Sequence, residues 1–311
     1  MGRKPPFSDR EAVLSLITGD VITSRRYKLL SDFERVYEFY AENHQPPNWF
    51  LTPASFEYAH THGAFEYTKT HRFGVWEDGG KIVATACFEM GLGSYIPCVQ
   101  RGYEFLMPEM LSYAERELSR LEHGKHSLEI FSTDEQNLDT FYAENGYTTM
   151  WSEAVLIYPY KKGFREPALP EGFTLISLED ENDAHKIDVC LWEGFDHGDW
   201  TESDDWADER LHMQSGPRFR KDLTTVVKAP NGDYACFAGM WMDERGGYAY
   251  LEPLATRPKY RGLGLASAAL TRAMQLTVPF GAQYCYCGGI DFYRKFGCEQ
   301  VGMRKTWRKE W

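Results

Sequence analysis

The stretch Arg257-Pro-Lys-Tyr-Arg-Gly-Leu-Gly-Leu-Ala266 stands between a run with strand character, YLEPLAT, and an alanine-rich run with helical composition, LASAALTRAMQLTV. Gly262 and Gly264 have no Cβ, so the backbone here can approach a ligand closely. The amides at the start of a helix converge on an anion, with help from the helix dipole. The stretch therefore predicts a pyrophosphate cradle, although the glycine spacing alone fits a tight strand-to-helix turn equally well.

The segments around this turn predict ten elements in the order β, α, α, β, β, β, α, β, α, β. Asn231-Gly232 and Gly246-Gly247 are expected to supply the positive φ angles of two hairpin turns. Thr201 followed by Asp204 is typical of a capping box at the start of the second helix. The expected ranges are 173–177, 181–192, 201–214, 222–230, 233–244, 247–256, 265–278, 282–287, 292–296 with a stop at Gly297, and 299–307.

Three segments in this order carry a family resemblance: YLEPLAT (250–256), Arg261-x-x-Gly264-x-Ala266, and FYRKFGCEQVG (292–302). Together they resemble the GNAT acetyltransferase family from about Phe173 to the end of the chain. The resemblance implies acetyl-CoA as cosubstrate. The pantetheine arm would pair with the backbone of Leu254, Ala255 and Thr256. The pyrophosphate would be held by Arg261, Gly262, Leu263, Gly264, Leu265 and Ala266.

Acetyl transfer to an amine needs a neutral nucleophile, a donor for the developing oxyanion and a proton for the departing thiolate. Tyr293 in FYRKFG matches the family's general-acid tyrosine, and a phenol with a pKa near ~10 can protonate the sulfur. Glu252 lies on the strand expected beside the cofactor and is the candidate general base. The alternatives are a core aromatic residue for Tyr293 and a structural carboxylate for Glu252, with ordered water as the base. The backbone N–H near Leu254 is the expected oxyanion donor.

The segment EGFDHGDWTESDDWADE (193–209) contains eight acidic residues and no Lys or Arg. In the family this region borders the acceptor pocket, and carboxylates beside aromatic rings attract a cationic amine. Candidate acceptor-binding residues are Asp196, Asp199, Trp200 and Asp204. A solvated acidic loop with helix-capping duties fits the same residues.

The first half repeats the second weakly, because FYAENGY (141–147) resembles FYRKFGC (292–298). The matching turn would fall in 94–111, where Gln100 and Gly102 lack the Arg-x-x-Gly-x-Ala spacing. This half is therefore expected to bind acetyl-CoA poorly or not at all, to use Tyr142 structurally, and to shape the acceptor cleft, with HQPPNWF (44–50) contributing.

These observations predict an α/β (α+β) chain of two tandem GNAT-like domains, each a mixed, mostly antiparallel twisted sheet flanked by helices. The first domain would span 1–160, the Pro- and Gly-rich segment 161–171 would be a linker, and the catalytic domain would span 172–311.

The chain has 311 residues and a formal net charge of −12, which argues against nucleic acid and anionic membranes as partners. We expect a cytoplasmic enzyme without a metal, because the seven cysteines are scattered and no signal peptide or spanning segment is evident. The acceptor would be a small cationic amine. A different acyl donor, an oxygen acceptor, a CoA-binding sensor without turnover, a protein lysine or N-terminal acetyltransferase, and a homodimer stay open.

Overall fold

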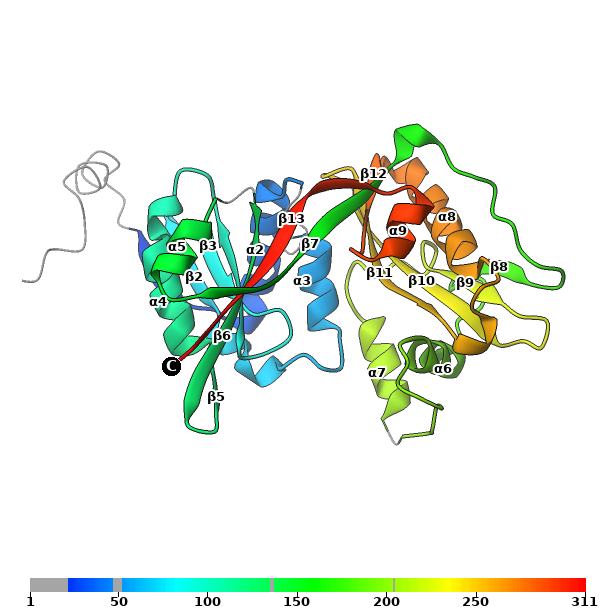
Figure 1. The fold of residues 1–311 in the computed structure, drawn as a ribbon, viewed down its shortest axis with the longest axis horizontal. Coiled ribbons are helices and arrows are strands. Elements are labelled where there is room, and N and C mark those ends of the chain that lie inside the picture. The colour runs from blue at the N-terminus through cyan, green and yellow to red at the C-terminus, as the bar shows by residue number, and fades with distance from the viewer. Residues whose placement is uncertain (1–21, 47–51, 135–136, 204) are drawn as a thin grey trace, which may run out of the picture.

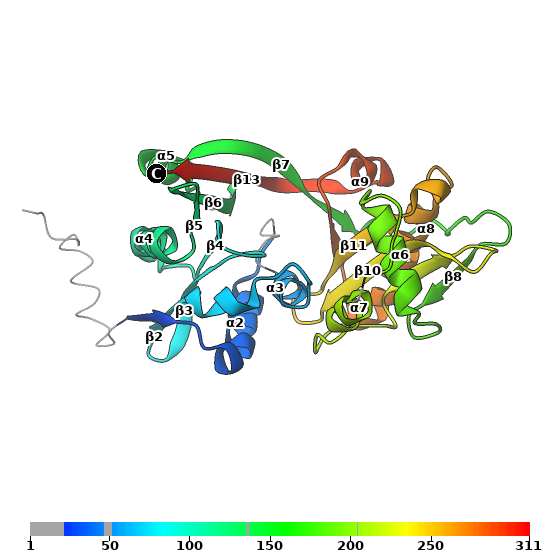
Figure 2. The same ribbon diagram turned by 90° about the horizontal axis from the view of Figure 1, so that it is seen from below.

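The chain forms two halves side by side, bridged by two long strands, β7 and β13 (Figure 1 and Figure 2). This computed structural model describes residues 22–46, 52–134, 137–203 and 205–311. The first half contains β1 (Thr23–Arg26), α2 (Leu29–Asn43), α3 (Pro53–His60), β2 (Gly74–Asp78), β3 (Lys81–Cys87), β4 (Ser94–Val99), α4 (Met107–Glu117), β5 (Arg120–Glu122), β6 (Lys125–Thr133), α5 (Asp139–Glu144) and β7 (Thr148–Pro159). The second half contains β8 (Thr174–Ser177), α6 (Ala184–Gly194), α7 (Trp206–Met213), β9 (Thr225–Lys228), β10 (Tyr234–Asp243), β11 (Tyr248–Thr256), α8 (Leu265–Thr277), β12 (Tyr284–Cys287), α9 (Asp291–Phe296) and β13 (Glu299–Glu310).

The ten elements expected after residue 172 are confirmed in type and order. The capping box is wrong. The second helix begins at Trp206, its N-cap Asp205 makes no side-chain capping bond, and Asp204 lies outside the described residues. The preceding segment is held elsewhere, because the indole N–H of Trp200 donates to Asp188 on α6 at 2.5 Å. A tertiary contact thus overrides a local capping signal.

The hairpin prediction is correct only in part, since the left-handed residue is the second of each pair. Gly232 and Gly247 have φ of 89° and 64°, whereas Asn231 and Gly246 are not in the left-handed region. One left-handed residue per turn is sufficient here.

The described strands form one 13-stranded sheet, mixed and mostly antiparallel as the sequence predicts. Its path runs β1-β2-β3-β4-β6-β13-β7-β12-β11-β10-β9-β8, with β5 against β6. The two parallel pairs, β4 with β6 and β11 with β12, occupy equivalent positions in the two halves. The internal repeat inferred from FYAENGY and FYRKFGC is therefore visible in the fold, where α5 and α9 each precede a long strand.

The long strands cross the boundary between the halves. β13 is last in sequence, yet its residues 304–310 pair with β6, and Trp307 is buried in the core of the first half. In return, the end of β7 pairs with β12 through residues 156–159. The predicted linker lies between β7 and β8, but the sheet continues from one half to the other without it, because β13 pairs with β6 in the first half and β7 pairs with β12 in the second.

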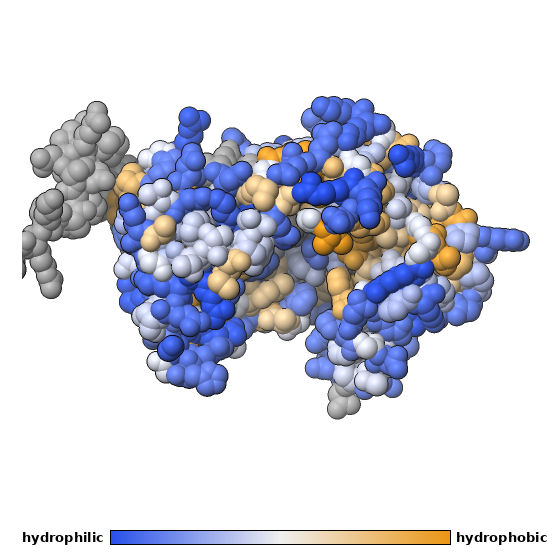
Figure 3. Space-filling view, in the orientation of Figure 1, coloured by the Kyte–Doolittle hydropathy of each residue, from blue (hydrophilic) through white to orange (hydrophobic). Residues whose placement is uncertain are grey.

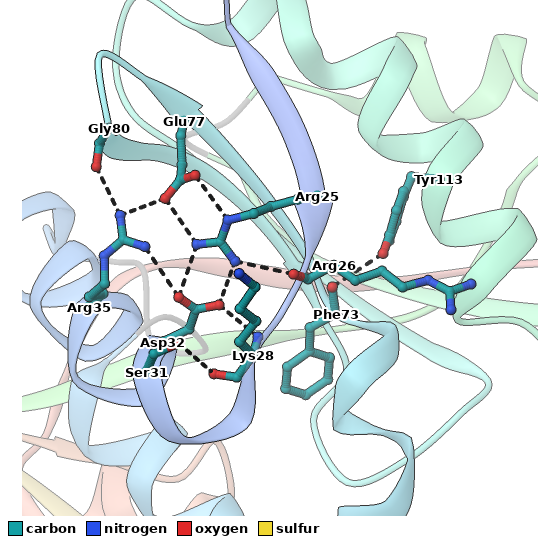
Figure 4. A network of polar contacts seen from close by, with 10 residues as sticks. All are labelled: Arg25, Arg26, Lys28, Ser31, Asp32, Arg35, Phe73, Glu77, Gly80 and Tyr113. Carbon is teal, nitrogen blue, oxygen red and sulfur yellow. Dashed lines mark hydrogen bonds and ion pairs between the residues drawn. The ribbon is translucent and has the colours of Figure 1, made fainter.

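A polar network fixes the edge of the first half (Figure 4). The guanidinium of Arg25 on β1 donates to Asp32 on α2 and to Glu77 on β2, and Arg35 reaches the same two carboxylates. Asp32 is 1% exposed, and these guanidinium groups hold the pKa of its carboxyl below the ordinary value against the opposing effect of burial. The network ties an otherwise short edge strand to the helix that covers it.

A second set of contacts joins the halves directly. The backbone N–H of Arg218 donates to Glu57 on α3 at 2.7 Å, and its guanidinium bonds Glu57 and Glu34. The same guanidinium lies 3.6 Å from the ring centroid of Tyr37. His44 extends the contact, since its ring lies against Tyr248 and its Nε2 is 3.0 Å from the hydroxyl of Tyr286. Helix α3 is thereby held against the second half.

Candidate active site

The strand β11 carries an irregularity where the site begins. Its register with β10 shifts between Ala238 and Met240, which leaves one extra residue on β11 around Glu252. Gly239 allows this shift, because a Cβ there would lie 2.4 Å from the carbonyl oxygen of Glu252. The indole N–H of Trp241 donates to the same carbonyl at 3.0 Å. The bulge is thus fixed from the neighbouring strand.

Beyond this point β11 and β12 separate. Their parallel pairing covers three residue pairs and ends at Tyr250 with Tyr286. The three residues predicted to pair with pantetheine, Leu254 to Thr256, lie past this end and are paired in register with β10 only. Their other edge faces the split, so an extended amide-containing ligand can add to it as a strand would.

The predicted cradle follows directly after β11. Gly262 and Gly264 have φ of 81° and 77°, and Gly264 is the N-cap of α8. A Cβ at either glycine would meet nothing within 4 Å, so the space in front of the turn is open. The first amides of α8 have no partner within the helix. The residues present therefore fit a pyrophosphate, and a cavity of about 340 Å³ continues from Gly264 between α8, α9 and the segment 165–168.

Arg261 has a bracing role in addition to any contact with a ligand. Its guanidinium donates to the carbonyl oxygens of Thr256 and Gly194 and forms an ion pair of 2.9 Å with Asp196. The predicted acceptor residue Asp196 is thus committed to the cradle side of the site. The turn is held to the end of α6 by these bonds.

Tyr293 on α9 is 8% exposed, and its ring lies over Gly288. A Cβ at Gly288 would lie 2.7 Å from the ring carbon Cε2. Burial raises the pKa of the Tyr293 phenol well above its ordinary value, and the charges of Cys287 and Glu252 add to the rise. The sequence-based assumption of an unperturbed phenol is therefore wrong, because the ring lies inside the fold. The hydroxyl stays protonated over the physiological pH range and is available as a proton donor.

Glu252 lies half-buried on the face of β11 that points toward the first half. Burial raises the pKa of its carboxyl to about 8, and the nearby charge of Glu89 contributes. Glu89 follows β3 in the first half, and burial also raises the pKa of this second carboxyl. Burial raises the pKa of Tyr58 and of Tyr250, and the charges of Glu252 and Glu89 add to the rise. All four side chains line one cavity.

This cavity has a volume of about 450 Å³ and lies between the two halves. Figure 3 shows the molecule hollowed between its halves, with hydrophobic side chains along the hollow. α2, α3 and the end of β3 supply most of the wall, and β11 and the segment after α6 close it. The lining residues are Tyr40, Ser55, Phe56, Tyr58, Ala59, His60, His62, Phe65, Cys87, Phe88, Glu89, Met90, Ile96, Phe195, His197, Tyr250 and Glu252.

The structure brings Glu252 to this cavity but not Asp196, Asp199 or Trp200, and Asp204 lies outside the described residues. Asp196 pairs with Arg261, Asp199 is exposed, and Trp200 packs against His185 and Trp206 beside α6. The acidic segment contributes its neighbours Phe195 and His197 instead.

The expected contribution of HQPPNWF can be followed only at its start. His44 packs on the second half at Tyr248 and does not line the cavity, and residues 47–50 lie outside the described residues.

Sequence reasoning missed Glu89 and Tyr58. The available signal for Glu89 is a lone acid in the apolar run ATACFEMG (84–91). Tyr58 lies on α3 among small and aromatic residues, PASFEYAH, and nothing in that pattern separates it from a core position.

Within the described ranges, no group of three or more His, Cys, Asp or Glu side chains is placed to hold a metal ion. No helix in those ranges is both long and apolar enough to cross a membrane. The site as described consists of carboxylates, phenols and backbone groups.

Comparison with known proteins places this geometry. Residues 184–298 match the model of the acetyltransferase (GNAT) family. No curated protein matches the sequence.

Among solved structures, a GCN5-related N-acetyltransferase from Sphaerobacter thermophilus is similar, with TM-score 0.61 and 16% identity over 93% of this chain and 95% of that one. A tandem GNAT protein from the clavulanic acid biosynthesis pathway has TM-score 0.62 and 11% identity over 93% and 98% of the two chains. A GNAT-family acetyltransferase from Colwellia psychrerythraea has TM-score 0.56 and 13% identity over 93% and 99%. The fold is therefore that of a tandem GNAT protein, and residues 184–298 are similar to the GNAT acetyltransferase family.

Proposed function

We propose that the chain is an acetyl-CoA-dependent N-acetyltransferase that transfers the acetyl group by direct attack of a primary amine on a small, cationic metabolite. The observation that carries this proposal is the line from cradle to cavity. The turn at Gly264, the unpaired edge of Leu254 to Thr256, and the pair Glu252 and Tyr293 follow one another along the split between β11 and β12. A thioester brought along this line supplies the activated acyl group.

Glu252 serves as the base that takes a proton from the acceptor ammonium. An ordinary glutamate lies about six pKa units below a primary amine of pKa ~10.4, a gap worth about 8 kcal/mol. With a pKa of about 8, Glu252 narrows that gap to roughly 3 kcal/mol. Burial therefore makes this carboxylate a far better match for its proton donor.

Tyr293 serves as the acid for the leaving sulfur. The amine nitrogen forms a bond to the acyl carbon, the carbon–sulfur bond breaks, and the phenol gives its proton to the departing thiolate. Because the phenol has a raised pKa, this transfer is concerted with bond cleavage rather than complete before it. The acylated nitrogen then loses one further proton to the Tyr293 phenolate, which restores the phenol.

The first half is not proposed to bind a second cofactor. In its equivalent turn, the N–H of Gly102 already donates to the carboxylate of Glu104 at 2.8 Å. The next residue, Tyr103, donates its hydroxyl to Asp78 at 2.6 Å. The Gly102 amide is thus already bonded to one carboxylate, and a second carboxylate is bonded to the adjacent residue; both negative charges disfavour a pyrophosphate at this turn. This supports a single cofactor site.

The testing experiment is calorimetric titration of acetyl-CoA into the native protein and two matched variants. Gly264→Glu and Gly102→Glu place the same side chain at the same kind of left-handed turn in the two halves. We expect one site, lost in Gly264→Glu and retained in Gly102→Glu. Two sites, or loss of binding only in Gly102→Glu, would contradict the proposal.

Turnover separates an enzyme from a sensor. Mass spectrometry of a mixture of amines with acetyl-CoA should show an N-acetylated product that the native protein forms and Gly264→Glu does not. Binding of acetyl-CoA without any product would favour a sensor.

A further inference from the structure

The cavity between the halves has an unusual charge. Its described lining contains two carboxylates, Glu89 and Glu252, and no Lys or Arg. Neither carboxylate forms a hydrogen bond or ion pair with any residue that the structure describes. The nearest cation that acts on Glu89 is Arg304 on β13, and this guanidinium is itself paired with Glu153. Arg304 thus acts on Glu89 only from beyond hydrogen-bonding distance, and the two acids have no direct ion-pair partner among the described residues.

Such an arrangement costs free energy unless something compensates it. A desolvated carboxylate without a partner is destabilising, and a second one beside it adds repulsion. His60 and His62 in the wall do not provide a positive charge. Burial lowers the pKa of His60 to about 4 and lowers the pKa of His62, so both are neutral at pH 7. His60 is 8% exposed, and its Nε2 has no partner within the described residues.

The rest of the wall is aromatic and is packed as a unit. The ring centroid of His60 lies 4.4 Å from that of Phe56 and 4.5 Å from that of Phe65. The ring centroids of Phe65 and Phe88 are 5.4 Å apart. Phe88 immediately precedes Glu89, so the charged point lies at the edge of this ring surface. A flat apolar group can pack on the rings while a cation reaches the carboxylates.

We propose that the first half builds the acceptor site, in which Glu89 binds the ammonium group of a primary monoamine and the aromatic wall holds its apolar, ring-sized body. The inference rests on the proposed function, because it names the acceptor class for the same site. Glu89 and Glu252 divide the work: the first anchors the ammonium and the second removes its proton.

The wall also explains why one positive charge is preferred over several. Both carboxylates line the same cavity, together with Tyr58 and Tyr250. Because both carboxylates serve the reacting ammonium, the second ammonium of a diamine would lie among the rings with no carboxylate left to pair it. Burying that charge unpaired costs several kcal/mol. An amine with a hydrophobic body has no such cost.

The test uses two probe amines, 2-phenylethylamine and butane-1,4-diamine, with product measured by mass spectrometry and binding by calorimetry. The variants are Glu89→Gln, Glu89→Asp and the control Glu144→Gln, an exposed carboxylate of the first half. We expect phenylethylamine to have a KM at least about tenfold lower than the diamine. Glu89→Gln should raise that KM by about tenfold to a hundredfold, the effect of losing a charge-assisted bond, while kcat changes far less.

Glu89→Asp should retain part of the affinity and Glu144→Gln all of it, which a merely structural role for Glu89 would not produce. If acetyl-CoA binds and the diamine is used as well as phenylethylamine, or if Glu89→Gln leaves KM unchanged, the acceptor assignment is overturned and the acetyltransferase proposal stands. If acetyl-CoA does not bind, the acetyltransferase proposal fails. In that case, saturable phenylethylamine binding that Glu89→Gln abolishes would still support the pocket, and its absence would overturn it.

Discussion

Replacing Glu252 with glutamine should change stability and activity in opposite directions. The amide keeps the size of the side chain but cannot ionise. Folding raises the pKa of this carboxyl from its ordinary value of 4.5 to about 8, chiefly because the group is buried and partly because Glu89 is close. The ionised form is therefore tolerated less well in the folded chain than in the unfolded one.

The sign of the pH effect follows from this rise. Below pH 4.5 the carboxyl is protonated in both states and contributes no penalty. Between pH 4.5 and pH 8 the unfolded chain loses the proton first, so the free energy of unfolding falls as pH rises. A rise from 4.5 to about 8 corresponds to roughly 4–5 kcal/mol, an upper limit because the carboxyl faces an open cavity. Glu252→Gln should remove this loss, so the variant gains stability above pH 8 and little below pH 5.

Activity should fall for the same reason. Without the base, the acceptor must arrive already neutral, and kcat should drop by about 10²- to 10⁴-fold near pH 7.5. The pH dependence should change as well. The native kcat should level off near pH 8, whereas the variant should keep rising toward the pKa of the amine, ~10.

Two measurements on the same preparations check this reasoning. Urea unfolding at pH 5 and pH 8.5 gives the difference in stability, and acetylated product formed between pH 6 and pH 10 gives the profile. An equal loss of stability at both pH values would refute the burial argument. A variant profile that still levels off near pH 8 would show that another group is the base.

The other predictions concern the general acid Tyr293, the contacts between the halves, and β13, which pairs with β6 of the first half. Tyr293→Phe should lower kcat by about a hundredfold with little change in the calorimetric Kd for acetyl-CoA. Gly288→Ala should lower kcat because the added Cβ displaces the Tyr293 ring, and a crystal structure of the variant would show this displacement. Arg218→Ala should leave Glu57, 1% exposed, without its guanidinium partner and cost about 3–5 kcal/mol in urea unfolding; a change below 1 kcal/mol would mean that the halves are held by other contacts. Trp307→Ala should cost about 3–5 kcal/mol and reduce protection from hydrogen exchange in β6, although the residue belongs to the last strand.

Local signals in the sequence account for what could be predicted. The ten elements of the second half follow from periodicity, hairpin glycines and the αL stop at Gly297, all of which act over a few residues. The cradle was predictable for the same reason, since Gly262 and Gly264 must supply positive φ within a single turn. Where a tertiary contact competes with a local one, as Trp200 does with the capping box, the local pattern fails.

The pairing of β13 with β6 and of β7 with β12, across the two halves, could not be predicted from local signals. Whether β13 pairs with β6 or with a strand of its own half depends on partners more than 160 residues apart in the sequence, and both choices satisfy the same alternation of side chains. The proposed acceptor residues could not be predicted for the same reason, because they are far apart in the sequence. Glu89 and Glu252 come to one cavity only when the halves assemble, whereas Asp196 of the predicted acceptor segment pairs with Arg261 and Trp200 packs beside α6.

On the proposed function, the two halves carry different parts of one reaction, and strands β7 and β13 hold these parts together. The second half retains the open cradle, whereas the first half has filled its equivalent turn with Glu104. In the first half, α3 and the end of β3 form a wall of the cavity, opposite β11. Such a wall can hold two carboxylates around one ammonium only if the halves keep a fixed separation, since charge interactions in a buried site change steeply with distance. Strands β7 and β13 run unbroken through both halves and supply that rigidity, so we attribute the geometry of the acceptor site to the sheet that joins the halves rather than to the linker.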